Sequence, residues 1–198
     1  MVDGVLFVCH ANMCRSPMAE FIARRLLRDL PVVVTSAGTD ALDGAAMHPY
    51  AVEVAARTGA DPAAFRTRRL RPEHLTRAAL VLTATRRQRS VCTALAPAAL
   101  HRTFTLRQFA RLAAAASVEA TEVTEPAEPI APAAPGEDSP LRTAVAAAAR
   151  ARGRLQPATL DADDLRDPIG GSPADFRRCA EEIERSIRPV LALIGTAG

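Results

Sequence analysis

The first 36 residues alternate two short apolar runs with one helical segment. The runs are VLFV at 5–8 and PVVVTS at 31–36, both rich in the branched or aromatic residues of buried strands. Between them, residues 18–29 place apolar side chains at helical intervals. Two strands joined by a helix form a right-handed crossover with the strands parallel. The chain must therefore cover a parallel sheet with helices.

The same alternation continues along the chain. Further strands are predicted at 78–83 and 101–106, and further helices at 49–57, 86–95 and 107–115. Ser172-Pro173 then opens a long amphipathic helix that runs to about Ile194. This pattern predicts a three-layer α/β fold, in which a doubly wound, four-stranded parallel sheet is flanked by helices.

Residues 113–140 differ in composition from the rest. They are dense in Ala, Pro and Glu without apolar periodicity, and we expect a mobile linker there. An Ala-rich helix at 141–152 follows, opened by Ser139-Pro140, and it either docks a partner or is a surface insert. We therefore predict a single domain over 1–198 that carries a mobile insert and an extra helix at 113–160.

Composition excludes several functions. The net charge is +3, the pI is about 9.0 and no run of five basic residues occurs, so nucleic-acid binding is not indicated. No leader or membrane-spanning stretch is evident, which predicts a cytoplasmic protein. Four cysteines in 198 residues do not indicate a disulfide framework. The sequence has neither a C-x-x-C motif nor paired histidines, so no metal site is predicted.

Cys9 and Arg15 lie at the junction between the first strand and its helix. Ligands bind beyond the carboxyl ends of parallel strands, where Cys9 falls. Ser16-Pro17 is a typical N-cap and first position, so the helix N-terminus would favour an anion in the loop. A cysteine beside a helix N-terminus and an arginine ionises more readily, and its thiolate is a strong nucleophile. Arg15 can hold two oxygens of a tetrahedral oxyanion.

Spacing alone would not establish this site. Cys179 and Arg185 have the same separation inside a predicted helix, where they are ordinary helix positions. The alternative for the first pair is a buried strand-end cysteine beside a surface arginine. The loop has no glycine, and we expect Asn12 to adopt positive φ and tie the loop to neighbouring backbone. Ser16 can donate a hydrogen bond to the Cys9 sulfur.

Phosphoryl transfer also needs an acid to protonate the leaving oxygen. Asp167 precedes Pro168 and Gly170-Gly171, so its carboxylate lies on a loop just before the last helix. That position suits a general acid, although a plain turn residue is the alternative.

These motifs resemble the low-molecular-weight protein tyrosine phosphatase family. The resemblance rests on VLFVCHANMCRSPMAE, on SAGT at 36–39 and on the late Asp167-Pro168, and it omits the insert. It implies that Cys9 attacks phosphorus, Arg15 binds the phosphoryl oxygens and Asp167 acts as acid and then base. The remaining loop positions would bind phosphate: His10, Ala11, Asn12, Met13, Cys14 and Ser16. A disulfide between Cys14 and the nucleophile under oxidation is also implied.

Other positions depart from the family pattern. Aromatic walls for the phosphotyrosine ring are usual after the Asp-Pro pair and after SAGT, where this chain has Ile169, Gly170 and Leu42. We assign Leu42 and Ile169 to the substrate rim. His10 and Ala11 replace the more usual Leu and Gly, and we expect His10 at the rim.

The resemblance implies hydrolysis of phosphotyrosine in protein substrates through a cysteinyl-phosphate, with no cofactor and no metal. One alternative is an arsenate reductase of the same fold, which would need Cys92 and Cys179 as relay thiols. A phosphoarginine phosphatase is a second relative, with Thr where this chain has Met13. A non-catalytic phosphate- or phosphoprotein-binding module is the third alternative. The oligomeric state is left open.

Overall fold

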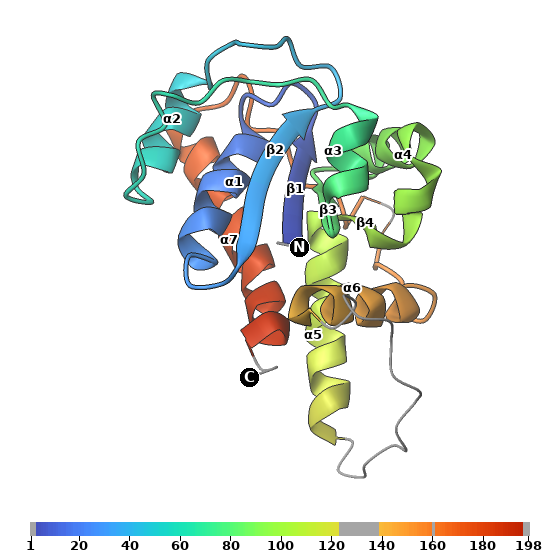
Figure 1. Ribbon diagram of the computed structural model, residues 1–198. Helices are drawn as coiled ribbons and strands as arrows, with labels where there is room; N and C mark the ends of the chain where they lie inside the picture. Colours follow the sequence, from blue (N-terminus) through green and yellow to red (C-terminus); the bar gives the residue numbers. More distant parts are fainter. Residues whose placement is uncertain (1–2, 123–138, 160, 196–198) are drawn as a thin grey trace.

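The computed structural model describes residues 3–122, 139–159 and 161–195. Four strands, β1 (Asp3–Cys9), β2 (Val32–Gly38), β3 (Leu80–Thr83) and β4 (Thr103–Thr105), form one parallel sheet (Figure 1). Their order is β2-β1-β3-β4. β2 lies on one side of β1, and β3 and β4 lie on the other, so the direction in which strands are added to the sheet reverses between β1 and β3. A crevice at such a point, beyond the carboxyl ends of the strands, is where open α/β sheets bind ligands.

Alternate residues of β1 enter two separate cores, which explains the continuous apolar run. Val5 and Phe7 belong to one cluster, and Leu6 and Val8 belong to the other. The first cluster is completed by α1 (Arg15–Leu26), α2 (Pro49–Ala56), α5 (Leu106–Glu122), α6 (Pro140–Ala151) and α7 (Pro173–Gly195). The second is completed by α3 (Pro72–Arg77), α4 (Arg86–Leu95) and the 3-10 helix η1 (Pro97–Arg102). The predicted three-layer fold is confirmed.

Some predicted boundaries were wrong. Helix α1 begins at Arg15 with Cys14 as its N-cap and no side-chain cap, so Ser16 is not the cap. Its hydroxyl is engaged elsewhere, as described below. Helix α3 and η1 were not predicted, and η1 takes the first two residues of the predicted strand at 101–106.

The predicted linker is partly helical. Helix α5 continues through Glu122, so residues 113–122 are helical and the expectation of a linker there was wrong. Alanine has the highest helix propensity, and the first proline of the segment comes only at Pro126. The remainder of that prediction, 123–138, lies outside the described residues.

Helix α6 is part of the core, neither a surface insert nor a helix with a free apolar face. Its buried residues join the first cluster and pack beside α5 and α7: Leu141, Ala144, Val145, Ala148 and Ala151. Ser139 caps it as predicted, with its hydroxyl oxygen accepting from the Arg142 N–H. Asp3 accepts hydrogen bonds from the Ser139 hydroxyl and from Arg142 Nε, the latter at 3.0 Å. Helix α6 is therefore fastened to the first residue of β1.

Candidate active site

The loop from His10 to Cys14 joins the end of β1 to α1. Carbonyl oxygens of the loop and of Cys9 before it accept hydrogen bonds from backbone N–H groups elsewhere, each at 3.0 Å: Thr39 donates to Cys9, Asp40 to His10 and His48 to Met13. None of the N–H groups of residues 11–14 donates a hydrogen bond to the described part of the chain. Buried N–H groups seldom lack a partner, and successive ones in a loop form an anion-binding site. The loop is thus suited to hold an oxyanion beside Cys9.

A chain of buried side chains fixes the sulfur at the start of this loop. Cys9 Sγ lies 3.0 Å from Ser16 Oγ, which accepts from Asn12 Nδ2 at 2.9 Å. The same amide donates to Ser36 Oγ at 2.9 Å, and Ser36 donates to a carboxylate oxygen of Glu20 at 2.5 Å. Burial raises the pKa of Glu20, and this effect is larger than the lowering by the hydrogen bond from Ser36. These bonds hold the Ser16 oxygen beside the sulfur, and its hydroxyl is also within hydrogen-bond distance of the Ala37 carbonyl, at 3.3 Å.

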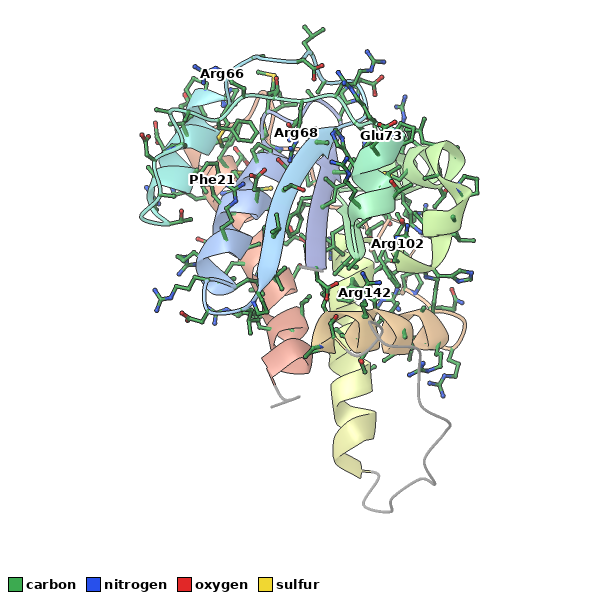
Figure 2. The ribbon with its side chains drawn as sticks, viewed as in Figure 1. Phe21, Arg66, Arg68, Glu73, Arg102 and Arg142 are labelled. Atoms are coloured by element: carbon green, nitrogen blue, oxygen red, sulfur yellow. The ribbon has the colours of Figure 1, made fainter. Side chains whose placement is uncertain are left out.

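Asn12 does what the sequence predicts for it. Its φ is +55°, and it is the one non-glycine residue of the described chain with positive φ. Its side-chain oxygen accepts from the Arg68 N–H at 2.9 Å, which ties the loop to neighbouring backbone. Arg68 lies beside β2 (Figure 2), and its guanidinium in turn donates to the Ser36 carbonyl of that strand.

Gly38 supports the loop from behind, and no larger residue fits there. A Cβ at this position would lie 2.4 Å from the His10 carbonyl oxygen and 2.7 Å from the Asn12 nitrogen. Both are backbone atoms, so the loop itself would have to move.

We expect Gly38→Ala to lower the free energy of unfolding by about 1–3 kcal/mol and to lower kcat/KM for an aryl phosphate as well. Gly153→Ala is the matched control, since a Cβ there meets nothing within 4 Å. Urea unfolding and steady-state kinetics measure the two effects. Unchanged kinetics in Gly38→Ala would contradict the assignment of the loop as the active centre.

Arg15 joins the loop to the late Asp-Pro segment. It is 6% exposed, and its two terminal nitrogens donate to the Leu165 carbonyl, at 3.1 Å, and to the Asp167 carboxylate. Its Nε is buried and makes no hydrogen bond to the described residues. Leu165 also donates its N–H to the Ala84 carbonyl at 2.8 Å, just beyond β3. The carboxyl ends of β1 and β3 thereby bring residues 9, 15 and 167 together.

These three residues line one pocket of about 90 Å³. Its lining consists of Cys9, His10, Ala11, Met13, Cys14, Arg15, Asp167 and Ile169. Every predicted loop position except the structural Asn12 and Ser16 lies on its wall. Leu42, the other predicted rim residue, is 78% exposed and is not among the lining residues. A larger cavity of about 510 Å³ beside α7 shares Asp167 and Ile169 with this pocket.

The other three cysteines are buried thiols. Burial raises the pKa of Cys14 to about 12, with the Asp167 charge adding to the effect. Burial likewise raises the pKa of Cys92 and of Cys179 to about 12. All four cysteines are free thiols, and the pair Cys179 and Arg185 lies on helix α7, as predicted.

In the described part of the chain, no helix combines the length and apolarity needed to cross a membrane. Nowhere in that part do three or more His, Cys, Asp or Glu side chains gather closely enough to hold a metal ion.

The family follows from comparison with known proteins. The family model described as low molecular weight phosphotyrosine protein phosphatase matches residues 4–130. The match covers more than half of the chain and contains all of β1 except Asp3, together with the loop and α1. The chain belongs to the low molecular weight phosphotyrosine protein phosphatase family.

Individual relatives include phosphatases named for two different amino acids. A probable low molecular weight protein-tyrosine-phosphatase EpsP from Ralstonia solanacearum is 42% identical over 82 residues, which are 41% of this chain and 55% of that protein. The chain thus spans about half the length of this relative. A protein-arginine-phosphatase from Geobacillus stearothermophilus is 39% identical over 106 residues, which are 53% of this chain and 70% of that protein.

Solved structures agree on the fold. The YwlE arginine phosphatase from Geobacillus stearothermophilus has a TM-score of 0.65 at 27% identity, covering 98% of this chain and 94% of that one. The tyrosine phosphatase amsI from Erwinia amylovora has a TM-score of 0.65 at 16% identity, with the same two coverages. The second likeness concerns the fold alone.

Sequence reasoning missed several residues that support the loop. Glu20 stands one helical turn after Ser16, but nothing in the spacing says that its carboxylate is buried against Ser36. Arg68 reaches the site from a segment without regular structure. The only available signal was Ser36 itself, the first residue of the SAGT motif.

Proposed function

We propose that this protein hydrolyses phosphotyrosine in protein substrates, and aryl phosphates generally, through a cysteinyl-phosphate intermediate. The proposal rests above all on one observation: Cys9, Arg15 and Asp167 line a single pocket although 158 positions separate the first from the last. Nucleophile, oxyanion-binding cation and acid are the three groups that such a reaction requires.

In the first step the Cys9 thiolate attacks phosphorus, and the bond from phosphorus to the phenolic oxygen breaks. Asp167 in its protonated form gives its proton to that oxygen, so tyrosine leaves neutral. Arg15 and the loop N–H groups hold the three non-bridging oxygens as charge develops on them. Substrate must first displace Asp167 from Arg15, because the carboxylate occupies one of the guanidinium nitrogens.

In the second step water attacks the phosphorus of the cysteinyl-phosphate. Asp167, now ionised, takes a proton from the water, and the sulfur leaves as a thiolate. Ser16 stabilises this thiolate by a hydrogen bond, given the 3.0 Å between oxygen and sulfur. The cycle ends with inorganic phosphate and the starting enzyme.

The chemistry also bears on where the protein works. A catalytic thiol must stay reduced, and the cytoplasm keeps thiols reduced. We therefore place the reaction in the cytoplasm, with phosphotyrosine-containing proteins as substrates. An arsenate reductase relay is less well supported, because Cys92 lies in the second core cluster, across the sheet from Cys14 and Cys179. The non-catalytic module remains the outcome if turnover is absent.

Phosphoarginine is a second candidate substrate. It is favoured by the protein-arginine-phosphatase relative, whose matched segment is longer than that of EpsP. Met13 is the position at which the family resemblance implies Thr in phosphoarginine phosphatases, and Met13 lines the pocket here. The apolar side chain suits an aromatic ring better than a guanidinium group.

The test uses the purified, reduced protein in the presence of a metal chelator. We expect release of phosphate from a phosphotyrosine peptide, with kcat/KM at least ten-fold above that for the same peptide carrying phosphoarginine. Met13→Thr is expected to narrow this ratio. A ratio that favours phosphoarginine would make phosphoarginine the substrate in place of phosphotyrosine. Absence of phosphate release from both peptides would favour the non-catalytic binding module.

A further inference from the structure

His10 has a fixed position at the mouth of the pocket. Its Nδ1 lies 3.0 Å from Asp40 Oδ2, and its carbonyl oxygen accepts from the Asp40 N–H at the same distance. Asp40 therefore holds both the backbone and the ring of the residue that follows Cys9. The His10 side chain is still 58% exposed, so the contact leaves much of the ring accessible.

Asp40 is itself held as a carboxylate. The Thr39 hydroxyl donates to Asp40 Oδ2 at 2.8 Å, and this bond lowers the pKa of Asp40, with smaller contributions from His10 and Arg69. An oriented carboxylate that accepts from Nδ1–H fixes the ring of a histidine and leaves its Nε2 side free. An exposed histidine would otherwise sample several rotamers. The contact with Asp40 therefore lowers the side-chain entropy that is lost when substrate binds.

Among the residues that line the pocket, His10 has the only ring. Ile169, also on the wall, is aliphatic and 56% exposed. A phosphotyrosine whose phosphorus is near the Cys9 sulfur must carry its ring out through this mouth. Flat side chains contribute to the binding of aromatic rings by stacking or by edge-to-face contact.

We propose that His10, oriented by Asp40, is a specificity-determining residue that forms the ring-binding wall of this pocket. This inference rests on the proposed function, because it concerns the leaving group of that reaction. It gives a function to the contact between the His10 imidazole and the Asp40 carboxylate.

The decisive readout is binding of two phosphonates that are not hydrolysed. Phenylphosphonate carries a ring and methylphosphonate does not, so the ratio of their dissociation constants isolates the ring contact. We expect His10→Leu to lower the affinity advantage of phenylphosphonate about 2- to 10-fold, and His10→Phe to restore it. His101→Leu, an exposed histidine in η1, is the matched control. With a phosphotyrosine peptide the same loss is expected in KM rather than in kcat.

Asp40 acts as a positioning residue in this scheme, and a double-mutant cycle tests it. Asp40→Ala should lower the phenylphosphonate advantage in the wild-type background and have no further effect in the His10→Leu background. The inference is wrong if the ratio is unchanged in His10→Leu, or if methylphosphonate binding falls as much as phenylphosphonate binding. Turnover of a phosphotyrosine peptide by the wild type tests the proposed function separately.

Discussion

Cys9→Ser is expected to reduce phosphatase turnover by on the order of 10⁴-fold or more, below detection in an aryl phosphate assay. A serine hydroxyl is a far weaker nucleophile than a thiolate near neutral pH, because it stays protonated there. The substitution replaces sulfur by oxygen with little change of shape, so the hydrogen bond to Ser16 can persist. Phenolate release measures the rate.

The same variant should still bind oxyanions. Arg15 and the loop N–H groups are untouched, so inorganic phosphate is expected to bind within a few-fold of the wild type. Cys92→Ala controls for the loss of a buried thiol, because Cys92 lies in the second core cluster. A Cys9→Ser protein that keeps turnover would exclude the cysteinyl-phosphate mechanism.

Asp167→Asn is expected to change catalysis and binding in opposite directions. The amide cannot give a proton to the leaving oxygen, so kcat should fall by about 10²- to 10⁴-fold. The amide also lacks the charge that pairs with Arg15 in the free enzyme. Phosphate then no longer competes with a carboxylate, and its inhibition constant should fall about five-fold, corresponding to ~1 kcal/mol.

Two measurements separate these effects. Steady-state kinetics with an aryl phosphate gives kcat, and competition by inorganic phosphate gives the inhibition constant. Asp29→Asn is a suitable control, since Asp29 is 87% exposed and forms an ion pair with its neighbour Arg28. A fall in kcat together with weaker phosphate binding would show that Asp167 supports the loop and is not the acid.

Sheet and loop could be predicted because local patterns determine them. The apolar run before Cys9 and the helical period after Arg15 specify a strand, a turn and a helix without knowledge of the rest. Asn12 could be assigned positive φ because few other residues accept it. Asp167 required the family resemblance, because only the folded chain brings it to Arg15.

What could not be predicted depends on tertiary contacts. Ser16 looks like an N-cap in sequence, yet its hydroxyl is bonded to Cys9 and Asn12. Asp40 is an ordinary exposed residue until the fold places it against His10. Leu42 was assigned to the rim by its distance from SAGT, and a loop of irregular backbone gives no period from which to check such an assignment.

Helix α6 lies at the amino ends of the strands (Figure 1), whereas the pocket around Cys9 lies beyond their carboxyl ends. One end is fastened to Asp3 of β1, and Arg152 at the other end donates to the Thr103 carbonyl of β4 at 2.8 Å. The contacts of α6 and the residues of the pocket thus lie at opposite ends of the sheet. A substitution in α6 is therefore expected to change the free energy of unfolding while leaving the geometry around Cys9 as it is.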